Sequence, residues 1–361
     1  MRESLQFGNK KIGAEEPCYI VLEAGPTHYG LESAIALVNI AADAGVDAIK
    51  FQIGDAKRLV PNSDTTISYT YLVNKHTGET ATITESLQKI LLRRQLTTDE
   101  WKKVAELCKT RGLMFFATVF DVEDLTLLRE LAVDCVKICS GDINYHYLLQ
   151  QAARYPWIIQ IDTGSSTIGE VEQAVDVLER SGCDQIIINH CPSGYPAHLE
   201  SINLRVIQTL HAMFPYPIAF SDHTPGVSMD VAALAMGADM IEKTITLDKT
   251  IQSPEHIMSL EPEEVASFIK TLREVEIALG KPRRVKSEKE LMAIPTGRRS
   301  IVAAQDIGLG TLLQQEHIAY ARPGVGLAPN MDTYILGKKS RRIITKGELF
   351  SISDVEEPYN Q

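Results

Sequence analysis

Short apolar runs alternate with longer stretches of helical periodicity from residue 19 to residue 246. The runs are rich in Val, Ile, Leu and Phe, which is typical of strands that are covered on both faces. A glycine follows several of the helical stretches, as at Gly45, Gly112 and Gly182, where it can form a left-handed cap. The pattern predicts eight strands, within residues 19–25, 48–53, 113–120, 135–140, 157–164, 185–191, 217–223 and 240–246.

Strands that alternate with helices imply right-handed crossovers and a parallel sheet. Eight such repeats favour an α/β fold of the closed (β/α)8 type, the TIM barrel, which needs about 250 residues. The alternative is an open Rossmann-like sheet. No GxGxxG follows the first strand, so the barrel is the better prediction.

Residues 55–90 break this rhythm, because they are long, polar and without a clear period. They follow the second strand on the face where active-site loops of a barrel lie. We expect an irregular element that covers a substrate, with a disordered surface insertion as the alternative.

A second break begins near Lys281 with a basic, proline-containing stretch. Short strand-like runs with glycine turns follow it to the end of the chain. We therefore predict a barrel domain of residues 1–281, a linker of residues 282–297 and a small β-rich domain of residues 298–361.

Composition and charge restrict the possible partners. The formal charge of −11 disfavours binding to nucleic acid. No apolar run reaches the roughly 20 residues that cross a membrane. The six cysteines form no CxxC pair and are expected to be buried, reduced thiols, which indicates a cytoplasmic protein.

Polar side chains end nearly every predicted strand. In a parallel barrel these strand ends and the loops after them form the active site. A set this large is unlike ordinary solvated strand ends, because each buried polar group without a partner costs about 1–3 kcal/mol. The set comprises Glu23, Lys50, Gln52, Thr118, Lys137, Ser140, Asp162, Thr163, His190, Ser221, Asp222, His223, Lys243 and Thr244.

Two lysines in this set, Lys50 and Lys137, lie near hydroxyl residues and indicate a site for a phosphate or carboxylate. Glu23 is either a general base or the salt-bridge partner of one of these lysines. His190 and His223 end neighbouring strands, so each is either a ligand of a divalent metal or a hydrogen-bonded core residue.

Taken together, the motifs resemble the sialic acid synthase family over almost the whole chain. The C-terminal part, with YARPGVGL at 320–327, is similar to the antifreeze-like SAF domain of that family, a β-clip fold. The matching barrel motifs are LEAGPTHYG at 22–30, AIKFQ at 48–52, FFATVF at 115–120, VKICSGD at 136–142, HCPSGYP at 190–196, FSDHTPG at 220–226, and ITLDKT with SPEHIMSLEP at 245–262.

The resemblance implies a transferase that condenses phosphoenolpyruvate with the aldehyde of an N-acylated amino sugar, similar to N-acetylmannosamine. The product is a sialic-acid-like nonulosonic acid, and phosphate is released. It further implies a divalent cation, Mn²⁺ or Mg²⁺, and a domain-swapped homodimer. The alternatives are a divergent relative with another donor or acceptor, one that works without a metal, and a non-catalytic sugar-binding relative.

The resemblance also implies roles for individual residues. Phosphoenolpyruvate would be held by Lys50, Thr118, Lys137, Ser140, Ser193 and Ser221. The catalytic residues would be Glu23, as acid or base, Asp142, which orients sugar hydroxyls, and the metal ligand His223. The sugar would contact Gln52, Tyr195, Glu255 and, from the partner subunit of the dimer, Arg322.

Three positions depart from the family pattern. Thr244 stands where the family has the second histidine ligand of the metal. Either His190, His256 or Glu255 compensates, the metal binds weakly, or the enzyme works without one. Asp162 stands where a serine donates to the phosphate, and a carboxylate beside a phosphate is repelled. Ser193 replaces an asparagine that commonly contacts the same ligand.

Overall fold

The computed structural model describes residues 4–14 and 16–356. The chain divides after Gly280 into two units, which are taken separately below. The ends of the predicted domain ranges, residues 1–3 and 357–361, lie outside the described residues. No helix in the described part of the chain is long and apolar enough to cross a bilayer.

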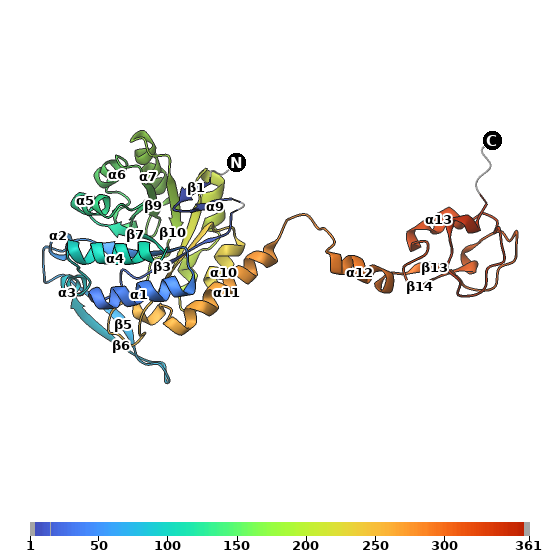
Figure 1. The fold of residues 1–361 in the computed structure, drawn as a ribbon, viewed down its shortest axis with the longest axis horizontal. Coiled ribbons are helices and arrows are strands. Elements are labelled where there is room, and N and C mark those ends of the chain that lie inside the picture. The colour runs from blue at the N-terminus through green and yellow to red at the C-terminus, as the bar shows by residue number, and fades with distance from the viewer. Residues whose placement is uncertain (1–3, 15, 357–361) are drawn as a thin grey trace. The chain divides into compact units, whose positions relative to one another are not determined.

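The first unit contains a closed barrel of parallel strands, which confirms the predicted fold class (Figure 1). Each predicted apolar run contributes one strand of four to six residues. In chain order the strands are β3 (Tyr19–Glu23), β4 (Ala48–Ile53), β7 (Met114–Val119), β8 (Cys135–Ile138), β9 (Ile158–Asp162), β10 (Ile186–His190), β11 (Ile218–Asp222) and β12 (Met240–Thr244).

Helices surround the barrel and bury their apolar faces against the outward side chains of the strands. Capping boxes at Thr97, Asp121 and Thr167 satisfy the first backbone N–H groups of three of these helices. The main helices are α1 (Leu31–Ala44), α4 (Thr98–Thr110), α5 (Val122–Glu130), α6 (His146–Ala152), α7 (Ile168–Arg180), α9 (Val206–Met213), α10 (Ser228–Ala235) and α11 (Pro262–Leu279), with the single turn α8 (Leu199–Ile202) between β10 and α9.

The inside of the barrel is layered. At the amino end of the strands, apolar residues such as Tyr19, Phe116 and Met240 form a cluster that a small hairpin covers, made of β1 (Leu5–Phe7) and β2 (Lys10–Ile12). Because strand side chains alternate between faces, the next inward positions, two residues further along, continue toward the carboxyl end. Those positions are polar on several strands, and they include Glu242 and Lys50.

The prediction that residues 55–90 are irregular is wrong. They form helix α2 (Ala56–Leu59), the antiparallel hairpin of β5 (Thr66–Asn74) and β6 (Glu79–Ser86), and the start of helix α3 (Leu87–Leu92). The hairpin sequences TISYTYLVN and ETATITES are rich in β-branched and aromatic residues, which pair well across strands. Lys75 at the tip pairs with Asp248 and Glu261, so the hairpin is held on the loop after β12.

The second unit is small and has its own core, which includes Ile301, Leu313, Ile344 and Phe350. Its regular sheet consists of β13 (Ser300–Ala303) and β14 (Ile318–Ala321), and isolated bridges and short helical turns make up much of the rest. The turns are η3 (Gln315–His317), η4 (Pro329–Met331), α13 (Asp332–Ile335) and η5 (Ile352–Asp354). Part of the predicted linker is helical, as α12 (Glu288–Gly297), because Ser287 caps that helix with Glu290.

Candidate active site

A cavity of about 500 Å³ opens at the carboxyl end of the barrel strands. It lies where the strand-end residues were expected to meet. Of the predicted site residues, the cavity is lined by Glu23, Lys50, Gln52, Thr118, Lys137, Ser140, Asp142, Tyr195, His223 and Glu255.

Five buried charges form the bottom of the cavity, and we call Glu23, Lys50, Lys137, Asp162 and Glu242 the floor cluster. Lys50 Nζ lies 2.8 Å from Glu242 Oε1 and also pairs with Glu23. Lys137 Nζ lies 2.7 Å from the same Glu242 oxygen and 3.0 Å from Asp162 Oδ1. Both lysines are therefore held by carboxylates, and the salt bridge considered for Glu23 is present.

The electrostatics of this cluster follow from burial and pairing. Burial raises the pKa of Glu23 above its ordinary value, and Lys50 opposes the shift. Burial also acts to raise the pKa of Glu242, but Lys137 and Lys50 outweigh it and hold that pKa well below the usual range. For Lys137, burial favours the neutral amine, yet Asp162 and Glu242 raise its pKa well above normal. Lys137 thus remains an ammonium group at neutral pH.

The rest of the cavity is less densely charged. The ring of Tyr195 lies 4.7 Å from that of His223, and Cys139 donates to Asp142 at 3.1 Å. Burial raises the pKa of Glu255 to about 7, and Arg94 partly counters it. A carboxyl group with this pKa is partly protonated at neutral pH, so it can donate as well as accept a proton.

Two predicted residues line a neighbouring cavity, and a third belongs to the second unit. Ser193 contacts Ser165 at 2.7 Å in a neighbouring cavity of about 340 Å³, which His190 also lines. Arg322 is exposed in the second unit, just after β14. The structure therefore does not bring Ser193 beside Lys50 and Lys137. The physical reason is that the turn after β10 directs its side chain toward the loop before α7.

The residues proposed for a divalent cation do not make a suitable ligand set. His223 Nδ1 faces the carbonyl oxygen of Pro192 at 3.0 Å, which leaves its Nε2 for the cavity. His190 Nε2 is bound to the carbonyl oxygen of Ile202 at 2.7 Å, and His256 Nδ1 to Thr246 Oγ1 at 2.6 Å. Within residues 4–14 and 16–356, no three His, Cys, Asp or Glu side chains are grouped to hold a metal. His190 and His256 thus do not replace the histidine missing at Thr244.

Some residues of the site had no predicted role. Strand alternation could have identified Glu242 as it identified Lys50. Glu242 stands two positions before Thr244 and so faces the same side of its strand. Gln160 and Asn189 lie beneath the floor cluster, where Gln160 Nε2 is 3.5 Å from Glu242 Oε2 and Asn189 donates to Asp162. Arg94 reaches the cavity from the segment after α3, and no pattern in the sequence marks it.

Glycine is required at position 25, because the backbone there passes close to Gln52 and to Glu23 of the floor cluster. A Cβ atom at this position would lie 2.5 Å from both the backbone nitrogen and Cγ of Gln52, and 2.7 Å from Glu23 Oε1. Its backbone N–H also donates to Glu23 Oε1 at 2.5 Å. Glycine at this position therefore lets the chain turn closely over the end of β3 and orient the carboxylate.

Comparison with known proteins also divides the chain into a larger N-terminal and a smaller C-terminal region. Residues 37–284 match the NeuB family, and residues 298–356 match the SAF domain. An uncharacterised protein of Methanocaldococcus jannaschii is 35% identical over 338 residues, which are 93% of this chain and 94% of that protein. The N,N'-diacetyllegionaminic acid synthase of Legionella pneumophila is 33% identical over 345 residues, which are 94% and 95% of the two chains.

A solved structure extends the comparison to three dimensions. The N-acetylneuraminic acid (sialic acid) synthetase of Leptospira borgpetersenii, crystallised with citrate, aligns with a TM-score of 0.71 and 31% identity. The alignment covers 81% of this chain and 96% of that one. These matches confirm the resemblance that the strand-end motifs and the C-terminal region carried.

Proposed function

Because this chain belongs to the NeuB family, we propose that it joins phosphoenolpyruvate to the open-chain aldehyde of an N-acylated amino sugar. The products are a sialic-acid-like nonulosonic acid and inorganic phosphate. Its relatives by sequence and structure include synthases of N,N'-diacetyllegionaminic acid and of sialic acid, which supports an enzyme of this broad class.

One observation carries the proposal. Lys50 Nζ, Lys137 Nζ and Ser221 Oγ all lie within 3.0 Å of a single atom, Glu242 Oε1. Two ammonium groups and a hydroxyl that converge on one anionic oxygen form a set of donors suited to the carboxylate or phosphate of the donor substrate. These are also three of the residues that the resemblance assigns to phosphoenolpyruvate.

The reaction forms one carbon–carbon bond and breaks one carbon–oxygen bond. C3 of phosphoenolpyruvate attacks the aldehyde carbon and water adds to C2. The bond from C2 to the bridging oxygen of the phosphate then breaks, the remaining hydroxyl on C2 becomes the ketone, and its proton leaves with the phosphate. In this scheme Glu23 accepts a proton from the water, since it is held in place by Lys50 and the N–H of Gly25. Glu255, with a pKa of about 7, gives a proton to the aldehyde oxygen as that oxygen becomes a hydroxyl. No step is assigned to a divalent cation, because the ligand set does not fit one.

The test is to incubate the full chain with phosphoenolpyruvate and N-acetylmannosamine or related amino sugars and to measure phosphate release. Phosphoenolpyruvate with ¹⁸O in the bridging position should transfer the label to phosphate, since the C–O bond breaks. A Lys50→Met variant should be inactive. Lys249→Met serves as the control, because Lys249 lies in a loop and pairs with Glu264. Absence of phosphate release across a broad set of aldehydes, with and without Mn²⁺, would contradict the proposal.

Asp162 favours a second candidate, a family member with a less highly charged donor such as a keto acid. Its carboxylate accepts from both Lys137 and Asn189, at 3.0 and 2.5 Å, and adds negative charge where a phosphate would bind. Lys137 is not suited to form a Schiff base with that donor, because its pKa is raised rather than lowered. Binding of pyruvate in preference to phosphoenolpyruvate, measured by calorimetry, would favour this candidate.

We also propose that the active enzyme is a domain-swapped dimer in which Arg322 completes the site of the partner subunit. Mixing inactive Lys137→Ala and Arg322→Ala chains under exchange conditions tests this. Half of the mixed dimers' sites then combine a native barrel with a native Arg322, so about a quarter of native activity should return. No recovery would contradict the swap.

The free cysteines fit a reducing compartment, so we place this enzyme in the cytoplasm.

A further inference from the structure

One side of the cavity is apolar and has no part in the reaction scheme above. Six aliphatic side chains line it, all from the segment between β4 and α4. Val60 and Ile90 are buried, Ile67 is half-buried and Leu59 is exposed. We call this set the apolar wall; it consists of Leu59, Val60, Ile67, Leu87, Ile90 and Leu91.

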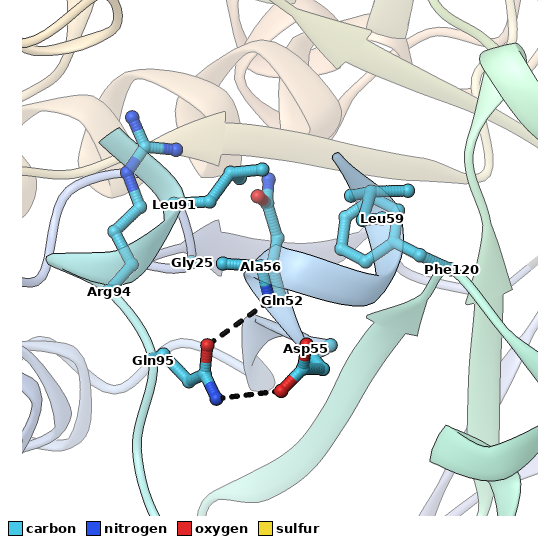
Figure 2. A pocket seen from close by; sticks show the side chains of 10 residues that line it. Gly25, Gln52, Asp55, Ala56, Leu59, Leu91, Arg94, Gln95 and Phe120 are labelled. Atoms are coloured by element: carbon cyan, nitrogen blue, oxygen red, sulfur yellow. Dashed lines mark hydrogen bonds between the residues drawn. The ribbon is translucent and has the colours of Figure 1, made fainter. Parts of the chain in front are cut away.

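A single cation stands at the edge of this wall. Arg94 follows α3, and in Figure 2 its side chain lies beside that of Leu91. Gln52 lines the same pocket. Its Nη2 donates to Ser253 Oγ at 3.1 Å. Among the described residues it makes no other hydrogen bond and no ion pair within 4.0 Å. A guanidinium group has five N–H donors, so most of its donors are available to a ligand in the cavity.

The neighbourhood of Arg94 belongs to the sugar side of the cavity. Burial lowers the pKa of the Arg94 guanidinium, and the Glu255 carboxylate opposes this shift. Tyr195 and Glu255 line the same cavity as Arg94. Gln52 lines the same two cavities as Arg94. These three neighbours are the barrel residues that the resemblance assigns to the acceptor sugar. The lysines of the floor cluster are paired with carboxylates, and they form a group separate from Arg94.

The combination of one cation and an aliphatic surface selects among the groups that an acceptor could carry. A phosphate ester would lose much of its hydration against the apolar wall and would meet Glu255 close by. A free ammonium group would be repelled by Arg94. An acylamino group fits both features, since its carbonyl oxygen accepts from a guanidinium and its methyl group packs against aliphatic side chains.

We propose that Arg94 and the apolar wall form the subsite for an acylamino substituent of the acceptor sugar. The carbonyl oxygen of the substituent accepts from the Arg94 guanidinium, and its methyl group contacts Leu87 and Leu91. This subsite rests on the proposed function for its acceptor class, but sugar binding tests it independently of turnover. Arg94 is then a residue that determines specificity and takes no part in bond making.

The chain offers a matched control one residue away. Arg93 pairs with Glu85 at 2.7 Å on the exposed side of the same segment and does not line the cavity. Arg93→Met removes the same charge and the same number of donors from the same turn. Any effect of Arg94→Met that Arg93→Met does not reproduce therefore comes from the cavity.

The experiment measures binding of three probes to the full chain by calorimetry: N-acetylmannosamine, mannosamine and N-acetylmannosamine 6-phosphate. We expect N-acetylmannosamine to bind the native chain more tightly than mannosamine. Arg94→Met should weaken N-acetylmannosamine binding about 10- to 100-fold, the usual effect of losing a hydrogen bond to a charged group, and leave mannosamine binding unchanged. Arg93→Met should change neither, and Arg94→Lys should recover only part of the loss.

Three results would overturn the subsite: equal effects of Arg94→Met and Arg93→Met, a 6-phosphate that binds more tightly through Arg94 than the neutral sugar, or no binding of any of the probes. Phosphate release and phosphoenolpyruvate binding are followed in the same variants. Normal phosphate release, together with an acyl discrimination that Arg94→Met leaves intact, contradicts the subsite alone. Acyl discrimination through Arg94 without any phosphate release contradicts the proposed function alone.

Discussion

The floor cluster and the apolar wall lie in one cavity but are built in opposite ways. The floor cluster consists of buried charges on the carboxyl ends of barrel strands, where register places Glu23 beside Lys50 and Lys137 close to Asp162. The apolar wall comes from the segment between β4 and α4. Our proposals assign the chemistry that needs fixed charges to the barrel strands and the selection of a substituent to this inserted segment.

The two regions should also differ in their response to substitution. Each member of the floor cluster neutralises another, so removing one leaves a buried charge unpaired. Members of the apolar wall make independent contacts, so a single change should alter affinity without disturbing the others. The following four predictions test this difference, from the largest expected effect to the smallest.

Lys137→Met should have the largest effect, because it leaves Glu242 and Asp162 without a shared cation. Phosphate release should fall at least about 1,000-fold, and the free energy of unfolding should drop by about 3–5 kcal/mol. Urea denaturation and steady-state assays measure the two losses. The companion change Lys137→Met with Asp162→Asn should restore part of the stability but none of the activity. Activity within tenfold of native would show that the floor cluster is structural.

Thr244→His should create the metal ligand that the cavity lacks. Thr244 pairs with Glu23 in register and lies next to the end of β11, where the Nε2 of His223 is available. Mn²⁺ should then bind at least about 10-fold more tightly than to the native chain, since two imidazoles replace one. Calorimetry on chelator-treated protein measures this without reference to activity. In the native chain, a chelator should leave phosphate release unchanged. Tight Mn²⁺ binding by the native chain would contradict our view of the ligand set.

Asp162→Ser should tighten binding of phosphoenolpyruvate by about 10-fold, because it removes one negative charge beside Lys137. The dissociation constant is measured by fluorescence or calorimetry, with pyruvate as the second ligand. Binding of N-acetylmannosamine should stay the same, since the apolar wall is untouched. An equal change for both substrates would mean that the floor cluster and the apolar wall are not independent.

The smallest effect concerns Glu255, which lies near Arg94 and whose pKa is raised to about 7. A raised carboxyl pKa stabilises the fold below the unfolded value near 4.5, and this contribution is lost as the pH rises toward 7. Because the side chain is partly exposed to the cavity, we expect a loss of about 1–2 kcal/mol. Urea denaturation at several pH values should show this loss in the native chain and not in Glu255→Gln. Identical pH profiles of stability for the native chain and Glu255→Gln would mean that a group other than Glu255 titrates.

Much of the barrel could be predicted because its signal is local. Each apolar run became one strand, and the polar residues that ended the runs came to line one cavity, as Lys50, Lys137 and Glu23 show. The hairpin at 66–86 was missed because its polar composition hid its β-branched residues. Ser193 was misplaced because the direction of a side chain in a turn depends on the turn's own backbone.

The sequence by itself determined the repeating strands and helices, the C-terminal region and the set of polar residues at the strand ends. Only the tertiary structure decided which of these meet. Lys50, Lys137 and Glu242 come from β4, β8 and β12, and they share one oxygen atom because the barrel closes. Arg94 reaches the cavity because the segment after β4 folds back over the mouth. Local patterns depend on neighbouring residues, whereas contacts between distant strands depend on how the whole chain closes.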